Sequence, residues 1–237
     1  MADKKTRYAM VIDLHRCVGC GACEIACKTH NEVPEGTFLT YHVNETTGTF
    51  PDVEYSYRPV MCNHCTDAAC VKACPTHAMH KDEYGLTVHD PSKCVACGLC
   101  AAACPYHAIT RCDGESSADQ VSSVKQLIKD CTGTPEEMQE FIGAKYPSHD
   151  PALDAYNLPN TRKGGPLKCQ MCKHLVYSGD KPYCVDACPA GARIFGNEAD
   201  IYGEIYELTQ SFEPTVLKPE KGTKPAVYYI REFKKTW

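Results

Sequence analysis

Short segments of alternating or continuous apolar character are the clearest structural signal along this chain. Tyr8–Asp13 and Leu86–His89 have the composition of short strands, and a third such segment follows at Ala192–Phe195. Two alanine-rich stretches, Cys23–Cys27 and Cys100–Cys104, each suit one helical turn. Because all of these elements are short, the pattern predicts an α+β fold that is rich in loops.

A longer helical pattern lies in residues 113–165. Thr134–Glu137 has the N-cap, first-turn proline and capping-box glutamate of a helix start, and Gly133 can end the helix before it. The stretch Tyr146–Gly165 is rich in Pro, Asn and Gly and is typical of a loop. We interpret residues 113–165 as a helical insertion that covers the core; a docking element for a partner subunit is the alternative. The apolar stripe of its first helix consists of Val121, Val124, Leu127 and Ile128.

Material for an ordinary hydrophobic core is scarce. Leu, Ile, Val and Phe together make up 41 of the 237 residues, a proportion typical of disordered chains. The 18 cysteines offer another source of stability, because a metal bound by distant side chains cross-links the segments that carry them. We therefore expect a folded, loop-rich protein that is poorly stable without its metal.

Sixteen of the cysteines form four groups, each of which opens with C-x2-C and closes with C-x3-C. In three groups a proline follows the closing cysteine directly. This is the spacing of bacterial ferredoxins, so the four groups predict four [4Fe–4S] clusters and a role in electron transfer. The groups are Cys17, Cys20, Cys23 and Cys27; Cys62, Cys65, Cys70 and Cys74; Cys94, Cys97, Cys100 and Cys104; and Cys169, Cys172, Cys184 and Cys188.

Disulfides and zinc are the two alternatives for so many cysteines. The C-x2-C loops are too tight and too regular for an ordinary disulfide framework, and C-x2-C-x2-C brings three thiolates together, which suits a metal. Structural zinc sites require neither a third cysteine at this spacing nor the closing C-x3-C-P. Cys112 and Cys131 lie outside the groups and are expected to be free thiols or small packing residues.

The closing cysteine of each group is expected to belong to a neighbouring site. On a helix it lies about one turn, or ~5.4 Å, from the third cysteine, so it cannot easily complete its own group. The groups also repeat in the order A-B-A′-B′, since residues 11–27 resemble residues 88–104 and the second group resembles the fourth. The fourth group differs by an eleven-residue loop, Lys173–Tyr183. Simple adjacency would pair the first group with the second.

Charged and histidine side chains near the motifs can be interpreted as ordinary surface or supporting residues, or as functional ones. The cations flanking ligand cysteines would raise cluster potentials locally, but an ordinary solvated cation is the expectation for each. The histidines would be able to replace a ligand, but every group is complete in cysteine, so surface or supporting roles are expected. These residues are Arg16, Lys28, Lys93 and Lys168, and His64, His77 and His107.

Charge and hydropathy exclude several classes of function. The formal net charge is −5 and no basic stripe is present, so no nucleic-acid partner is expected. No apolar run approaches a membrane span, and the first residues lack the apolar core of a secretory signal. We expect a soluble chain that is cytoplasmic or that is exported or membrane-associated with its partner. No phosphate-binding glycine loop or acid–base constellation appears, so substrate chemistry is assigned to that partner.

The four motifs together resemble a known family. VIDLHRCVGCGACEIACK, CNHCTDAACVKACP, DPSKCVACGLCAAACPY and KCQMC…PYCVDACPAGARIFG are similar to the electron-transfer subunits of molybdopterin oxidoreductases of the dimethyl sulfoxide reductase superfamily. The resemblance covers residues 7–112 and 166–200 and is weaker in the tail, and the insertion 113–165 departs from it. It implies two pseudo-repeated, bacterial-type ferredoxin-like domains with two [4Fe–4S] clusters each.

The resemblance also implies which groups exchange their closing cysteines: the first with the fourth, and the second with the third. Domain A would then comprise residues 1–58 and 166–237, with domain B, residues 59–112, nested inside it. The implied ligand sets are Cys17, Cys20, Cys23 and Cys188; Cys169, Cys172, Cys184 and Cys27; Cys62, Cys65, Cys70 and Cys104; and Cys94, Cys97, Cys100 and Cys74.

By the same resemblance the chain relays electrons, in anaerobic metabolism, between a molybdenum- or tungsten-pterin catalytic subunit and a redox partner. That partner is either a quinone-linked membrane subunit or a soluble carrier. The cluster with Cys17, Cys20 and Cys23 would lie nearest the catalytic subunit. Two other functions remain open: a free-standing polyferredoxin, and clusters that are structural or regulatory.

Overall fold

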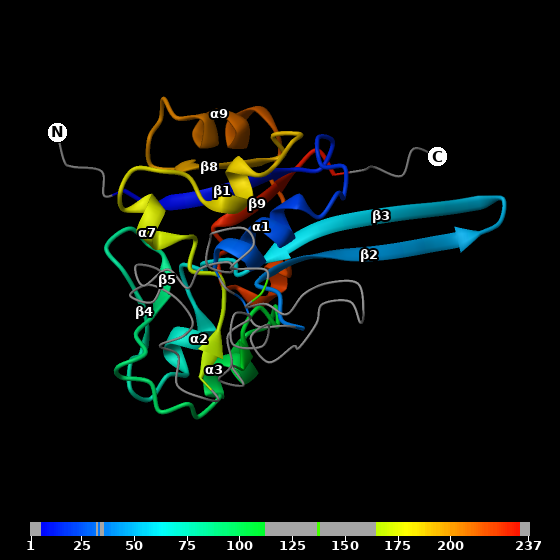
Figure 1. Ribbon diagram of the computed structural model, residues 1–237. Coiled ribbons are helices and arrows are strands. Elements are labelled where there is room, and N and C mark those ends of the chain that lie inside the picture. Colours follow the sequence, from blue (N-terminus) through cyan, green and yellow to red (C-terminus); the bar gives the residue numbers. More distant parts are fainter. Residues whose placement is uncertain (1–5, 32, 34–35, 112–136, 138–164, 233–237) are drawn as a thin grey trace.

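The computed structural model describes residues 6–31, 33, 36–111, 137 and 165–232 (Figure 1). Cys112, Cys131 and the helices predicted within 113–165 therefore lie outside the described residues, apart from Glu137. The described elements are, in chain order, β1 (Tyr8–Asp13), α1 (Ala22–His30), β2 (Thr40–Thr49), β3 (Asp52–Met61), α2 (Ala69–Lys72), β4 (Met79–Lys81), β5 (Thr87–His89), α3 (Leu99–Ala103), β6 (Thr110–Arg111), β7 (Pro166–Leu167), α7 (Lys173–Val176), α8 (Tyr183–Asp186), β8 (Arg193–Asn197), α9 (Glu204–Ser211), the 3-10 turn η2 (Pro219–Lys221) and β9 (Val227–Ile230).

A three-stranded sheet joins the beginning of the chain to its last third. Its order is β8-β1-β9, with β1 antiparallel to β8 and parallel to β9. In Figure 1 this sheet lies in the upper part of the molecule, with α9 over it. The apolar side chains of β1 explain its central position, because Met10, Val11 and Ile12 are fully buried and a strand covered on both faces needs a continuous apolar run.

The middle of the chain forms the lower part of the molecule in Figure 1. It contains the β4–β5 hairpin and the two short helices α2 and α3, which pack against each other. Strand β6 pairs with β7, so that Thr110 lies opposite Leu167 and Arg111 opposite Pro166. The chain therefore leaves and re-enters this part of the fold at one place, on either side of the segment 112–165.

A long hairpin, β2–β3, projects from the body of the molecule (Figure 1). Its two ten-residue strands are buried at the base, near Thr40 and Met61, and exposed toward the tip. Gly48 near the tip has φ +83°, and a Cβ there would lie 2.0 Å from the carbonyl oxygen of Asp52, so the turn requires glycine. This hairpin is not among the elements expected from the sequence.

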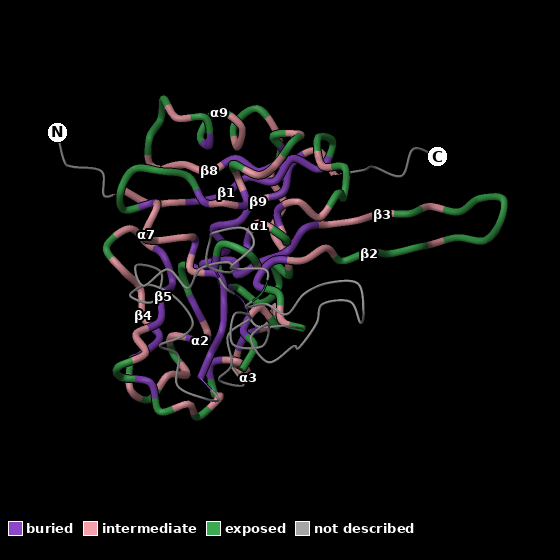
Figure 2. Tube along the Cα trace, in the orientation of Figure 1, coloured by how far each residue is buried: buried purple, intermediate pink, exposed green. Residues whose placement is uncertain are grey.

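Cysteines make up part of the core instead of surrounding it. Buried residues follow the sheet strands and the segments that link the two parts of the molecule (Figure 2). The largest apolar cluster contains side chains of β1, β7 and β9 together with five cysteines, and a second cluster in the lower part contains four. The nine cysteines are Cys23, Cys27, Cys62, Cys169 and Cys184, and Cys65, Cys70, Cys100 and Cys104.

The short elements expected beside the motifs are confirmed. Tyr8–Asp13 is β1, while Leu86–His89 and Ala192–Phe195 overlap β5 and β8. Cys100–Cys104 overlaps α3, and Cys23–Cys27 lies within the longer α1. Helix α1 extends to His30, and the basic residues Lys28 and His30 in its last turn suit the negative end of the helix dipole.

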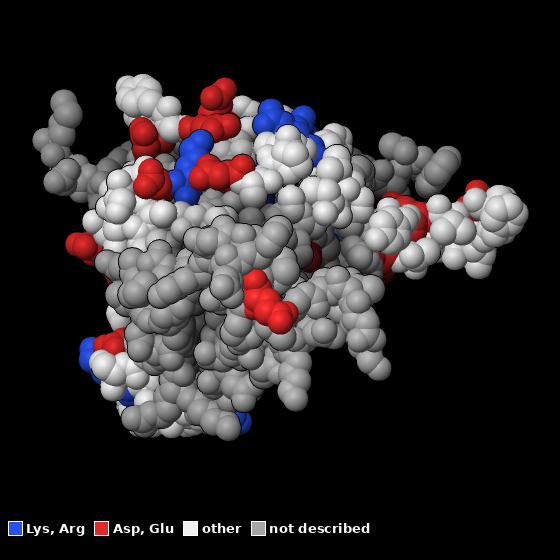
Figure 3. Space-filling model, viewed as in Figure 1, with Lys and Arg blue, Asp and Glu red and all other residues white. Residues whose placement is uncertain are grey.

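The length of the helices and the charge of the surface are the next features of the fold. No helix in the described part of the chain is long and apolar enough to cross a membrane. On the face shown in Figure 3, acidic side chains gather around α9, whose first turn contains Glu204 and Glu207.

The buried carboxylate of Asp13 fastens β1 to the segment after β9. It accepts hydrogen bonds from the backbone of His15 and from Arg231 Nε at 2.9 Å. Burial by itself would raise the pKa of Asp13, but the hydrogen bond and charge of Arg231 outweigh it and hold that pKa below its usual value. Asp13→Asn is therefore expected to lower the free energy of unfolding by about 1–3 kcal/mol, measured by thermal unfolding.

The matched control is Glu232→Gln. The ion pair between Glu232 and Arg58 is 2.9 Å long, and both of its side chains are more than a third exposed, so its loss should cost less than about 1 kcal/mol. Equal losses in the two variants would contradict the role given to Asp13.

Candidate metal centres

The four C-x2-C loops share one backbone feature, although the fourth loop has a further left-handed residue at Cys172. The residue before the second cysteine has a left-handed φ in each loop, and three of these residues are not glycine, which costs about 1–2 kcal/mol apiece. The left-handed turn directs the amide of that residue toward the first sulfur: Ala96 N lies 3.3 Å from Cys94 Sγ, and Met171 N lies 3.3 Å from Cys169 Sγ. The four residues are Gly19 (φ 64°), His64 (φ 44°), Ala96 (φ 56°) and Met171 (φ 56°).

The closing cysteines also receive hydrogen bonds. Met79 N donates to Cys74 Sγ at 3.4 Å, and Ala192 N donates to Cys188 Sγ at 3.2 Å. At Cys27 the donor is a side chain, since Asn31 Nδ2 lies 3.5 Å from the sulfur. Amide donors favour a sulfur that carries negative charge, as a metal-bound thiolate does.

The cysteines meet around cavities that combine two groups. In three cavities, three cysteines from one group are joined by the closing cysteine of another. The sets that line them are Cys17, Cys20, Cys23 and Cys188; Cys27, Cys169, Cys172 and Cys184; and Cys74, Cys94, Cys97 and Cys100. Below they are called the first, second and fourth sites.

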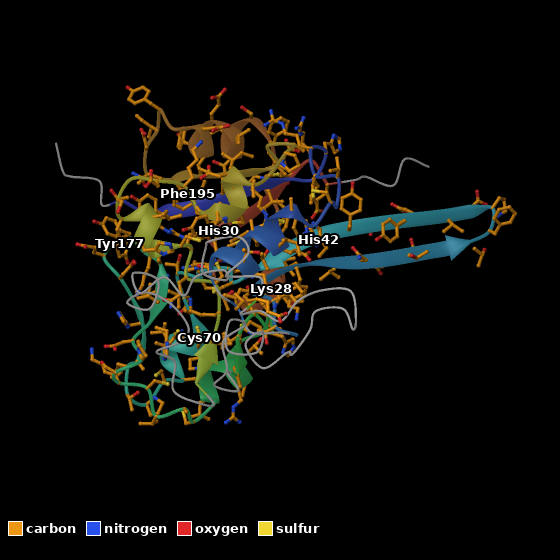
Figure 4. All side chains as sticks on the ribbon, in the orientation of Figure 1. Lys28, His30, His42, Cys70, Tyr177 and Phe195 are labelled. Atoms are coloured by element: carbon orange, nitrogen blue, oxygen red, sulfur yellow. The ribbon has the colours of Figure 1, made fainter. Side chains whose placement is uncertain are left out.

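The remaining four cysteines are brought together in the lower part of the molecule. Burial raises the pKa of Cys70 to about 12, and the neighbouring charges of Cys62, Cys104 and Cys65 add to this. Burial raises the pKa of Cys65 as well, and the charges of Cys62 and Cys104 add to that rise. We call Cys62, Cys65, Cys70 and Cys104 the third site. Figure 4 shows Cys70 in the lower part of the molecule, well separated from His42 at the base of the hairpin.

Helix packing explains why the closing cysteines cross between groups. Helix α1 carries both Cys23 and Cys27, one turn apart, and packs against α8, where the rings of His30 and Tyr183 stack at 4.1 Å. Cys23 thus lines the first site and Cys27 the second. In the lower part α2, which carries Cys70, packs against α3, which carries Cys100.

The environment of the thiols is suited to a polynuclear metal group. All sixteen motif cysteines are free of disulfides. Burial raises the pKa of Cys172 to about 12 and that of Cys27 and Cys169 also well above the usual value, and bound iron would supply the positive charge that deprotonates such thiols. Within the described ranges no three His, Cys, Asp or Glu side chains converge on a single ion; the cysteines surround cavities instead.

Three histidines singled out by the sequence differ in position. His64 is fully buried, and its Nδ1 accepts a hydrogen bond from Thr87 N at 3.1 Å, while burial holds its pKa well below the usual value. His77 and His107 are exposed and have left-handed backbones. None of these three lines any of the cavities described above.

The expectation of solvated cations is wrong for Lys168. It is 1 % exposed, and its Nζ donates to the carbonyl oxygens of Thr87 and Cys169. The side chains of Arg16 and Lys93 are more than half exposed, as expected. Lys28 donates to two nearby backbone carbonyls, those of Val33 and Thr37.

Sequence reasoning missed other side chains at the cavities. His42 and Arg193 line the first site, and His89 lines the fourth. His42 Nε2 is 3.9 Å from Cys17 Sγ, and its Nδ1 pairs with Glu24. His42 comes from the hairpin, nineteen residues past Cys23, so motif spacing offers no signal for it.

Comparisons with known proteins match both the motifs and the whole chain. Residues 53–136 match a 4Fe-4S dicluster domain and residues 10–30 a 4Fe-4S binding domain. The chain is 43% identical over 239 residues to the arsenate respiratory reductase iron-sulfur subunit of Shewanella sp. (strain ANA-3), in an alignment that covers 96% of this chain and 97% of that protein.

Other relatives are named as subunits of other reductases. A selenate reductase subunit of Mesobacillus selenatarsenatis is 35% identical, with 94% of this chain and 72% of that protein covered. A tetrathionate reductase subunit of Salmonella typhimurium is 32% identical, with the same two coverages of 94% and 72%.

Proposed function

The chain belongs to the iron–sulfur electron-transfer subunits of reductase complexes, and from that premise we propose that it holds four [4Fe–4S] clusters in series between a catalytic subunit and a redox partner. The observation that carries this proposal is the set of three cavities, each lined by three cysteines of one motif and the closing cysteine of another. When bound, the clusters supply one-electron redox chemistry.

The proposed ligands are the cysteines of the four sites defined above. The first and second sites belong to ferredoxin-like domain A, residues 1–58 and 166–237, and the third and fourth to domain B, residues 59–112. Two observations support this nesting: β1 pairs with β8 and β9, and the strands on either side of 112–165 pair with each other. The two domains would be pseudo-repeats of one two-cluster unit, in agreement with the shared loop conformation of the four motifs.

Contacts between cysteines of different sites support a linear order. Cys23 of the first site, Cys169 and Cys184 of the second, and Cys62 of the third belong to one core cluster. Cys70 of the third site lies on α2, and Cys74 of the fourth follows two residues after the end of that helix. Each site thus has a neighbour that an electron can reach next, and the series has two ends.

Exposure of the end sites supports their use for exchange with partners. Cys20 and Cys97 are the two exposed members of the sixteen motif cysteines, and they belong to the first and the fourth site. Each has exposed apolar neighbours, Val18 and Ile25 near Cys20, and Val95 and Leu99 near Cys97. Exposed apolar side chains beside a redox centre suit docking of a protein partner.

Family membership supplies the nature of these partners as part of the proposal. The first site would face a catalytic subunit that carries a molybdenum or tungsten pterin. The fourth site would face the second redox partner, a quinone-linked membrane subunit or a soluble carrier. This chain itself is the non-catalytic subunit, as its relatives named as iron–sulfur subunits of reductases are.

Isolation of the protein from its native host tests the proposal. About sixteen iron atoms per chain are expected from four cubanes, together with a co-eluting catalytic subunit. Iron near eight per chain, or stoichiometric zinc, would reject the four-cluster arrangement. A stable monomer with sixteen irons and no partner would instead support the alternative of a free-standing polyferredoxin. Redox titration of the same sample separates electron transfer from a structural role, because structural clusters would not be reduced and reoxidised at physiological potentials.

A further inference from the structure

Arg193 is a buried cation at the wall of the first site. It is the first residue of β8 and is 3 % exposed. Its Nη2 donates to Thr40 Oγ1 at 2.8 Å, and its Nη1 lies 3.3 Å from the Met61 sulfur. No carboxylate of the described residues lies within ion-pair distance of it, in contrast to Arg7, Arg58 and Arg231.

Arg193 lies beside two sites. It lines the first site, and Thr40 and Met61, the side chains that its guanidinium contacts, line the second. The thiols of Cys17 and Cys23 in the first site have pKa values raised by burial, and the guanidinium charge opposes that rise. It does the same at Cys27 of the second site. Burial by itself would lower the pKa of Arg193, but neighbouring thiols raise it, Cys184 of the second site more than Cys23 of the first. The guanidinium therefore lies between the two sites.

A buried cation without an anionic partner is strongly unfavourable. The hydroxyl of Thr40 and the thioether of Met61 are neutral and cannot compensate it. A metal group ligated by four thiolates carries net negative charge, and net charge and nearby dipoles set its potential. An anionic group in these two cavities would compensate the unpaired positive charge of Arg193.

We propose that Arg193 is the shared counter-ion of the clusters in the first and second sites and raises the reduction potentials of both; this rests on the proposed function. An electron that arrives at either site adds one negative charge beside the guanidinium. Arg193 remains protonated throughout, so the reduced form is stabilised without uptake of a proton. The electron itself comes from the redox partner of the complex.

The test is a redox titration of the complete complex, followed by electron paramagnetic resonance, with Arg193→Met. Two of the four midpoint potentials are expected to fall and the other two to stay unchanged. Arg193→Lys retains the charge and is expected to recover most of the loss, which a purely structural role of the guanidinium would not predict. An unchanged set of four potentials, or an equal fall of all four, would overturn the proposal.

The matched control is Arg16→Gln. Arg16 precedes Cys17 directly, but its side chain is 53% exposed and lies 3.5 Å from the Asp13 carboxylate, so solvent screens its charge. Its removal should leave all four potentials close to those of the unaltered protein, and a shift as large as that of Arg193→Met would contradict the proposal. Iron is measured first in every sample: sixteen irons with unshifted potentials refutes the role of Arg193 alone, whereas a low iron content in the unaltered complex refutes the four-cluster function.

Discussion

Cys27→Ser is expected to destroy the cluster bound by Cys169, Cys172 and Cys184 and to spare the one bound by Cys17, Cys20 and Cys23. The reason is that Cys27 lines the second site although its motif supplies the first. Iron should fall from about sixteen to about twelve atoms per chain, as one cubane of four irons is lost. Iron analysis and electron paramagnetic resonance of the purified complex measure both effects.

Double variants identify which cluster is lost. Cys27→Ser combined with Cys172→Ser should remove no more iron than either change alone, because both residues line the second site. Cys27→Ser combined with Cys20→Ser should remove about eight irons, since two sites are then damaged. The reverse pattern, with Cys27 and Cys20 behaving as one site, would show that each group keeps its own closing cysteine. Cys27→Ala serves as a further variant, because it leaves no oxygen ligand for iron.

Removal of iron is expected to unfold most of the protein. Nine cysteines belong to the two larger core clusters, and without a metal their buried thiols neither cross-link the chain nor replace aliphatic packing. Metal sites of this kind contribute stability comparable with the whole ~5–15 kcal/mol of a domain. Treatment with an oxidant and a chelator should therefore abolish near-ultraviolet circular dichroism and cooperative thermal unfolding.

The third core cluster provides the internal control for this prediction. It contains Ala9, Val11, Ile194, Ile205, Ala226 and Ile230 and no cysteine. Residual hydrogen-exchange protection after iron removal should concentrate in β1, β8, β9 and α9, which carry five of these six residues. An iron-free chain that unfolds as cooperatively as the loaded one would show that aliphatic packing alone maintains the fold.

Local spacing was sufficient to divide the motif cysteines into groups and to predict the elements beside them. The C-x2-C loops and the alanine-rich turns are each stabilised by contacts within a few residues, so Cys100–Cys104 was recognisable as a helix. The apolar segment Tyr8–Asp13 was recognisable as a strand. The left-handed residues of the loops could be predicted only in part from the sequence. Glycine, as at Gly19, commonly adopts a positive φ, whereas histidine, as at His64, does not. The hairpin β2–β3 was missed because most residues of β2 are polar, although Val53, Tyr55 and Tyr57 of β3 do alternate with polar residues.

The sequence by itself determined that the chain binds iron–sulfur clusters, because ligand type and spacing are local chemistry. It left open which groups share their closing cysteines. The resemblance to a family implied which groups exchange them. Only the tertiary structure brought Cys188 to Cys17 and Cys27 to Cys169, and it alone revealed Arg193 between them. These contacts join residues more than a hundred positions apart. They depend on the packing of α1 against α8 and of β1 between β8 and β9, which no short-range pattern encodes.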